Sequence, residues 1–129
     1  MVTVRVNKVF AAPPTEEELA KQAKASKLQQ IEDDYIASEE QTIEVSGVVY
    51  SGGMSSVEAI DSYVRLNRLA GNTTHNIWDV NGIEHSLTDN EVDGVILAIG
   101  VQASANKFTK KNRKVALAVA TTITEVEAV

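Results

Sequence analysis

The sequence predicts an α+β fold in which a small antiparallel sheet, with a central Asn-Gly hairpin, packs against helices. Three observations support this prediction. Short stretches alternate apolar and polar residues, which is the period of a strand with one buried face. Four segments place a Thr or Ser three residues before a Glu, which is typical of a helix N-terminus. Asn81-Gly82 lies between two alternating runs, where this dipeptide favours a two-residue hairpin turn.

The N-terminal part predicts a strand followed by a long polar helix. Alternating valines predict the strand, which must pair with a sheet in this chain or in a neighbouring subunit. Thr15 and Glu18 form a capping box, and the helix is expected to extend to about Ser38. Because its apolar stripe is sparse, this helix is either partly exposed or docked on a partner. The residues expected to contact partner chains are Val2, Val4, Val6, Leu19, Leu28, Ile31 and Tyr35.

These features divide the chain into two parts. Residues 1–40 form the N-terminal strand and docking helix, and residues 41–129 form a compact α+β domain. In the second part, one strand is expected from Ile43 through Tyr50, and Ser51-Gly-Gly53 then turns the chain. A second capping box, from Ser55 to Glu58, opens a helix that ends before Gly71.

The Asn-Gly hairpin predicts which side chains face the core. Counting outward from the turn pairs Trp78 with His85 on one face and Asp79 with Glu84 on the other. Like charges opposite each other are unfavourable unless water screens them, so the face with Asp79 should point outward. The residues expected to face the core are then Trp78, Val80 and Ile83.

Two further helices are expected in the C-terminal part. Thr88 and Glu91 form a third capping box, which opens the most apolar helix of the chain. This helix either extends through Lys110 or breaks near Phe108 and restarts. Thr122 begins a fourth box and a last short helix.

The composition excludes several classes of site. Without cysteine, the chain has no disulfide, thiolate nucleophile or thiolate-bound zinc. A net charge of −6 disfavours nucleic acid as a partner. The apolar stretches are far shorter than the roughly 20 residues of a membrane span, and the N-terminus does not resemble a signal peptide. We therefore expect no membrane insertion and a cytosolic origin.

No spacing of residues predicts a catalytic, cofactor or metal site, so we expect that the protein is not an enzyme. His75 is expected in a solvated loop, and His85 is expected to pack across from Trp78. The remaining enzymatic alternative is a small hydrolase with paired carboxylates, drawn from Asp79, Glu84 and Asp89.

One charge cluster is present, with five basic residues within eight positions. It either docks an acidic partner or forms a solvated helix face near a helix C-terminus, where cations are favoured. The residues of this basic cluster are Lys107, Lys110, Lys111, Arg113 and Lys114.

The order of motifs resembles a family of uncharacterised phage and prophage proteins that are encoded among tail-fibre genes. The segments that carry the resemblance are Pro14-Thr-Glu-Glu-Glu-Leu19, Lys27-Leu28-Gln-Gln-Ile31 with Tyr35, Val45-Ser-Gly-Val-Val-Tyr50, Ser55-Ser-Val-Glu-Ala-Ile60, Trp78-Asp-Val-Asn-Gly82 and Ala118 to Val129. They span about nine-tenths of the chain, but none is an active-site signature.

The resemblance implies a non-enzymatic component of the virion tail, associated with the fibre or baseplate, that is assembled in the host cytoplasm and acts by protein–protein docking. It implies other tail or fibre proteins as partners, and an oligomer such as a trimer. Two alternatives stay open: an assembly chaperone that is not retained in the virion, and a tip that binds host-surface carbohydrate through exposed aromatic residues.

Overall fold

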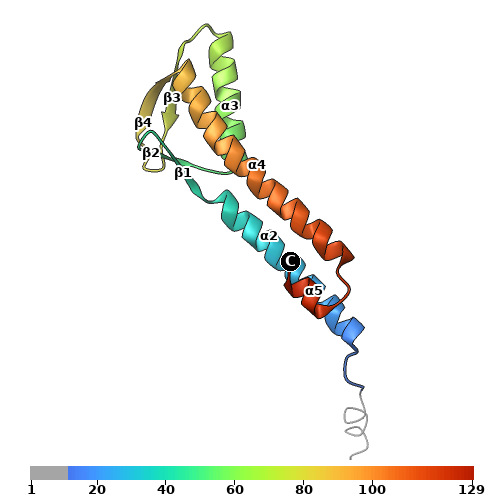
Figure 1. Ribbon diagram of the computed structural model, residues 1–129. Helices are drawn as coiled ribbons and strands as arrows, with labels where there is room; N and C mark the ends of the chain where they lie inside the picture. The colour runs from blue at the N-terminus through green and yellow to red at the C-terminus, as the bar shows by residue number, and fades with distance from the viewer. Residues whose placement is uncertain (1–11) are drawn as a thin grey trace, which may run out of the picture.

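The computed structural model describes residues 12–129, and it confirms the α+β fold class (Figure 1). The strand predicted at Val2, Val4 and Val6 lies outside the described residues. In chain order the elements are α2 (Glu16–Glu39), β1 (Thr42–Val45), β2 (Val48–Ser51), α3 (Met54–Leu69), β3 (Thr74–Trp78), β4 (Glu84–Thr88), α4 (Asp89–Val119) and α5 (Ile123–Glu127). The strands form two separate antiparallel hairpins rather than one sheet.

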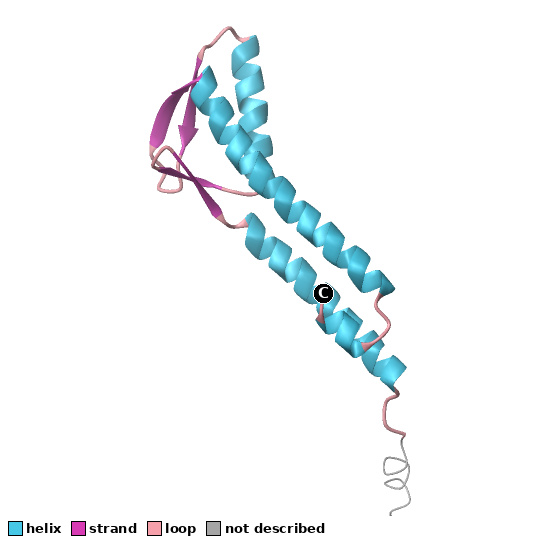
Figure 2. Cartoon of the chain, in the orientation of Figure 1, coloured by secondary structure: helices cyan, strands magenta, loops and turns pink. Residues whose placement is uncertain are grey.

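Helix α4 is the central element of the fold, because it runs along almost the whole length of the molecule (Figures 1 and 2). Its first half packs with α3 and the two hairpins, and its second half lies beside α2. The helix is continuous through Phe108 to Val119, so of the two alternatives the break near Phe108 is wrong. Among residues 12–129, no helix combines the length and the apolar character that crossing a membrane requires.

The larger hydrophobic core lies where α3, α4 and both hairpins meet. Ile99 and Val92 of α4 are completely buried, and Val64 of α3 is buried beside them. The remaining buried members of this core are Tyr50, Val57, Ile77 and Val95. Burial of such side chains is the main stabilising contribution to the fold.

A second core joins α2 to the C-terminal part of the chain. Ile31 of α2 is 1% exposed and packs with Leu117, Ala120 and Val126. Helix α2 is therefore an integral part of the described fold, and the proposed division at residue 40 does not coincide with a break in packing. Ile31, which was expected to contact a partner chain, is covered by the chain's own helices.

The single strand expected from Ile43 through Tyr50 is wrong, because the segment forms a hairpin. Val45 pairs with Val48, and Ser46 and Gly47 form the two-residue loop between them. Both loop residues have positive φ, at 53° and 79°, as a type I′ turn requires. Glycine takes this conformation without strain, and the turn folds the strand back on itself.

The register predicted for the second hairpin is wrong by one residue. Trp78 pairs with Glu84, and Ile77 pairs with His85. The loop is longer than two residues because the Asp79 carboxylate accepts the N–H groups of Asn81 and Ile83, at 2.8 and 3.0 Å. Gly82 then has φ of 75°, as in a hairpin with a type I turn and a glycine bulge.

A shift by one residue exchanges the two faces of a hairpin. The side chains expected in the core are therefore exposed: Trp78 by 58%, Ile83 by 56% and Val80 by 41%. Asp79 was expected to point to solvent, and its side chain is only 9% exposed. The Val80 N–H donates to the Val49 carbonyl at 3.0 Å, which ties the two hairpins together.

Three of the four predicted helix starts are confirmed. The Thr15 and Thr122 hydroxyls accept the N–H groups three residues later, and Thr88 forms the full reciprocal box with Glu91. The capping box at Ser55 is wrong, because α3 begins at Met54. Its N-terminus is capped by a distant side chain instead: Glu39 of α2 accepts the Met54 N–H at 2.6 Å.

Candidate functional site

Both histidines are paired with aspartates, an arrangement that occurs in catalytic sites, but His75 is closed to solvent. It is 0% exposed, so its expected position in a solvated loop is wrong. The Asn67 amide donates to the Thr74 carbonyl and to His75 Nδ1, each at 2.9 Å. Since Nδ1 accepts, Nε2 carries the proton and donates to Asp89 at 2.6 Å. Both ring nitrogens are thus occupied, and His75 ties α3, β3 and α4 together.

His85 belongs to the folded hairpin and does not pack across from Trp78. Its Nε2 lies 2.9 Å from the Asp79 carboxylate, and its ring meets the Tyr50 ring edge-on with centroids 6.2 Å apart. Hydrogen bonds from His85 and from the Ile83 amide lower the pKa of Asp79. Asp79 is thereby held ionised as a turn-forming acceptor, which makes it a poor proton donor at neutral pH.

Asp89 is held ionised in the same way. Hydrogen bonds from His75 and then from Arg68, which also pairs with Asp93, lower the pKa of Asp89. Two of the three carboxylates of the hydrolase alternative, Asp79 and Asp89, are therefore used within the fold, whereas Glu84 is exposed. In the described part of the chain, no group of three or more His, Cys, Asp or Glu side chains could hold a metal ion.

This geometry predicts an acid-sensitive fold. A carboxylate whose pKa is lower in the folded than in the unfolded state stabilises the fold above the unfolded value of about 3.9, and this contribution disappears as the pH falls through the folded pKa. We expect the melting temperature to be steady at neutral pH and to fall below about pH 4. Asp89→Asn, measured by circular dichroism over the same pH range, should decline less steeply. A variant whose profile parallels that of the wild type would contradict this role of Asp89.

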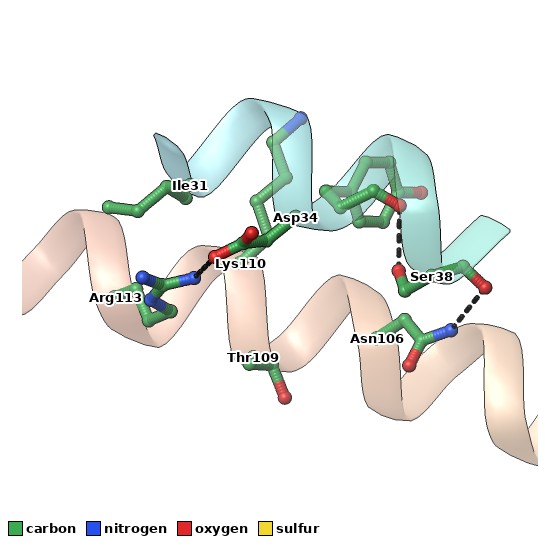
Figure 3. Close-up of a pocket in the computed structure, with 8 residues that line it drawn as sticks. Ile31, Asp34, Ser38, Asn106, Thr109, Lys110 and Arg113 are labelled. Atoms are coloured by element: carbon green, nitrogen blue, oxygen red, sulfur yellow. Dashed lines mark hydrogen bonds and ion pairs between the residues drawn. The ribbon is translucent and has the colours of Figure 1, made fainter. Parts of the chain in front are cut away.

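The basic cluster lies on the second half of α4, and three of its five cations form ion pairs within the chain. Lys110 and Lys114 both pair with Glu32, at 2.9 and 2.5 Å, and their hydrogen bonds lower the pKa of that carboxylate. Arg113 pairs with Asp34 at 2.7 Å (Figure 3). Within residues 12–129, only Lys107 and Lys111 of this cluster have no ion pair.

The seam between α2 and α4 encloses a small cavity, which Ile31, Asp34, Ser38 and Asn106 help to line (Figure 3). Its volume of about 80 Å³ is well below the roughly 300 Å³ of the smallest common ligand pockets. The Asn106 amide donates to the Ser38 carbonyl across the seam at 3.3 Å. We interpret the cavity as a packing defect between helices.

The residues predicted to dock partners on α2 have different environments. Leu19 and Leu28 are 40% and 44% exposed, so both are accessible. Tyr35 is half-buried, and the Lys110 ammonium lies 4.5 Å from the centre of its ring. Leu19 and Leu28 are thus accessible to a partner chain on α2, whereas Ile31 is buried.

Among residues 12–129, the exposed apolar feature that spans the most residues along one helix is a face of α4 that the sequence reasoning missed. It lies opposite the buried side of the helix and is called here the outer face. At 1.5 Å per residue it extends over about 33 Å. Its apolar members are 59–73% exposed, although side chains of this kind are more often buried. They are Leu97, Val101, Phe108, Val115 and Val119.

The spacing of these residues is the signal that could have revealed the outer face. Leu97 and Val101 are four residues apart, and Val101, Phe108 and Val115 follow at intervals of seven. A repeat of seven residues places side chains on one side of a helix, as in helices that pair with other helices.

Comparisons with protein-family models, curated proteins and solved structures found no match for this chain.

Proposed function

We propose that this protein is a non-enzymatic bacteriophage tail component, associated with the tail fibre or baseplate, that acts by docking to other proteins. The observation that carries the docking role is the outer face of α4, where large exposed apolar side chains recur along one side of the helix. Exposed apolar side chains gathered on one face mark interaction sites. The assignment to a phage tail rests on the motif resemblance from Pro13 to Val129.

The polar groups of the fold support a docking role over a catalytic one. Both nitrogens of His75 are occupied, and Asp79 and Asp89 are held as ionised structural acceptors. Other tail or fibre proteins are the proposed partners, and the proposed contact residues at the N-terminal end are Val2, Val4, Val6, Leu19 and Leu28. The proposed place of action is the virion tail, after assembly in the host cytoplasm.

Mass spectrometry of purified phage particles tests this proposal. We expect peptides of this chain in particles at a constant ratio to the fibre or baseplate proteins. Peptides that appear only in the infected lysate, together with fibre proteins, would favour the alternative of an assembly chaperone that leaves before the particle is complete. A chain that copurifies with no tail protein in either fraction would contradict the proposal.

A carbohydrate-binding tip is a second candidate because Trp78 is exposed instead of buried. Trp78, Asn76 and Tyr63 line a groove between β3 and α3. Flat aromatic side chains together with an amide suit the apolar faces and hydroxyls of a sugar.

Substitution of Trp78 distinguishes the two candidate functions. Under the docking proposal, Trp78→Ala keeps both the melting temperature and adsorption of phage to host cells near wild-type values, because more than half of the Trp78 side chain is exposed. Adsorption assays and circular dichroism measure the two quantities. A variant that keeps its melting temperature but loses adsorption would favour the carbohydrate-binding tip.

A further inference from the structure

A cavity lies where both hairpins meet the first half of α4 (Figure 1). Ser46 and Val48 line it from the first hairpin, Ser86 and Leu87 from the second, and Asn90 from α4. Its volume of about 570 Å³ is within the range of roughly 300–1,000 Å³ that is usual for ligand sites. Three separate elements thus border one space that has room for a small molecule or for a side chain of another protein.

Tyr50 supplies this cavity with a buried polar group that has no partner. The residue is 2% exposed and belongs to the lining. Within residues 12–129 its hydroxyl makes no hydrogen bond, and Glu39 Oε1 is the only fully enclosed side-chain polar atom there that lacks a partner. The Tyr50 hydroxyl is therefore not sealed, and the space that Tyr50 borders is the cavity. Because a buried hydroxyl without a hydrogen bond costs free energy, a ligand that bonds it is favoured.

Two further lining residues have unused acceptor atoms. The ionised Asp79 carboxylate accepts a hydrogen bond from His85 Nε2 at 2.9 Å, so His85 Nδ1 carries a lone pair. In the described part of the chain, that nitrogen bonds to no other group. Glu91 uses Oε1 to accept the Thr88 N–H at 3.1 Å, which leaves Oε2 as an acceptor. The cavity thus offers acceptors from β2, β4 and α4.

The charges around the cavity are negative. Glu84 and Glu91 line it, and none of its described lining residues is a lysine or an arginine. Burial raises the pKa of the Tyr50 hydroxyl, and the charges of Asp79 and Glu91 raise it further, so the carboxylates act on the hydroxyl. A negative site attracts a cation and repels an anion.

The rest of the lining is apolar and suits an alkyl chain next to the cation. Val45, Leu87 and Val95 belong to this part. Lysine and arginine side chains both combine an alkyl stem with a charged head. The guanidinium of arginine has five N–H donors in a plane, whereas an ammonium has three. A guanidinium therefore matches more of the acceptors, which come from separate elements.

We propose that this cavity binds the side chain of an arginine from a partner protein. The guanidinium donates to the Tyr50 oxygen, to His85 Nδ1 and to the Glu84 carboxylate, and its stem packs on the apolar lining. This proposal rests on the proposed docking function, and it names the chemistry of one contact with another tail or fibre protein.

Titration of the isotope-labelled full chain with Nα-acetyl-arginine amide tests the site by amide NMR. We expect saturable shifts at Tyr50, Ser86 and Gly94. Nα-acetyl-citrulline amide has nearly the same shape without the charge, and it should bind at least about tenfold more weakly. Absence of saturable shifts at these amides, or equal affinities for the two compounds, would overturn the proposal.

Removal of one hydroxyl tests the contact with Tyr50. We expect Tyr50→Phe to weaken binding of Nα-acetyl-arginine amide by about fivefold, since it removes a hydrogen bond and keeps the ring. Tyr63→Phe is the matched control, because the Tyr63 hydroxyl accepts the Asn76 N–H and lies in the groove beside α3. It should bind like the wild type. Equal affinities of Tyr50→Phe and wild type would refute this contact and the proposal with it.

Removal of one charge tests the contact with Glu84. Glu84→Gln should weaken binding by about threefold. Glu58→Gln changes the net charge equally but lies on α3, outside the lining, so it should leave the affinity unchanged. Equal losses in the two variants would show attraction to the whole chain instead of a site, against the proposal.

A variant that fills the cavity tests its position without removing a polar group. Gly94 lines the cavity, and a Cβ atom there meets nothing within 4 Å, so a larger side chain has room. We expect Gly94→Leu to keep the fold, as measured by circular dichroism, and to weaken binding at least about tenfold. A folded Gly94→Leu variant with wild-type affinity would contradict the proposed position.

Agmatine, a free guanidine, distinguishes a small-molecule ligand from a protein side chain. Under the proposal it binds no more tightly than Nα-acetyl-arginine amide, and tenfold tighter binding would overturn the assignment to a partner protein. Failure of the site and failure of the proposed function are distinguishable. A chain that is present in phage particles but binds no arginine derivative would refute only the site. A chain that binds arginine but copurifies with no tail protein would refute the proposed function.

Discussion

Ile99→Ala is expected to lower the free energy of unfolding by about 4 kcal/mol, because the site is a fully enclosed part of the larger core. Ile99 is 0% exposed and lies on the buried side of α4, among residues of α3 and both hairpins. Truncation of the Ile99 side chain would leave a cavity. Because the continuous helix α4 fixes one side of that cavity, the neighbouring elements are poorly placed to fill it. Urea denaturation followed by circular dichroism measures the effect.

Ile36→Ala is the matched control for this prediction, since the same side chain is removed from an exposed position on α2. It should change the free energy of unfolding by less than about 0.5 kcal/mol. Equal losses in the two variants would show that the buried side of α4 is assigned incorrectly, and with it the outer face.

Gly52→Ala is expected to lower the free energy of unfolding by about 3 kcal/mol. A Cβ atom at Gly52 would lie 2.2 Å from the Gln41 carbonyl oxygen. The Gly52 N–H also donates to that oxygen at 2.8 Å, so the two backbone segments are fixed together at the base of the first hairpin. Both segments are backbone and cannot move aside as a flexible side chain could. Relief of the clash therefore requires α2, β2 and α3 to separate at their junction.

Gly94→Ala is a control for which the opposite change in the free energy of unfolding is expected. Gly94 lies within α4, and a Cβ atom there meets nothing within 4 Å. Alanine favours the helix over glycine by about 1 kcal/mol, so this variant should be more stable than the wild type. Denaturation midpoints of the two variants on the same side of the wild type would contradict the steric account of Gly52.

Local signals were sufficient to predict the fold class and most helix starts. Thr15, Thr88 and Thr122 cap their helices through residues three positions away, so the sequence contains both partners of each interaction. The start of α3 could not be found in this way. Its capping group, Glu39, belongs to another helix and meets Met54 only in the folded chain.

The hairpins show how a small error in the predicted pairing of strands changes which side chains are expected at the surface. The Asn-Gly signal correctly located the second turn, but the Asp79 carboxylate bonds enlarge the loop and shift the register. This shift moved Trp78 from the expected core to the surface. The first hairpin was missed because Ser46-Gly47 interrupts an apolar run only briefly.

The charge cluster and the outer face depend on which neighbours α4 acquires. The sequence shows five basic residues together, but only the packing of α2 reveals that Glu32 and Asp34 form ion pairs with three of them. Similarly, apolar residues occur all around α4, and the fold decides which of them are covered. Ile99 and Leu97 are two residues apart, yet one is fully buried and the other is 67% exposed.

The central claim, that the outer face of α4 is covered when the protein acts, is tested most directly by the rate at which a thiol on that face reacts. A maleimide should label Ser104→Cys slowly in the assembled state, and quickly when Phe108→Glu is added. Ser26→Cys, at an exposed position on α2, should react quickly in both cases. Fast labelling of Ser104→Cys in concentrated chain, in lysate complexes and in purified particles would contradict the account.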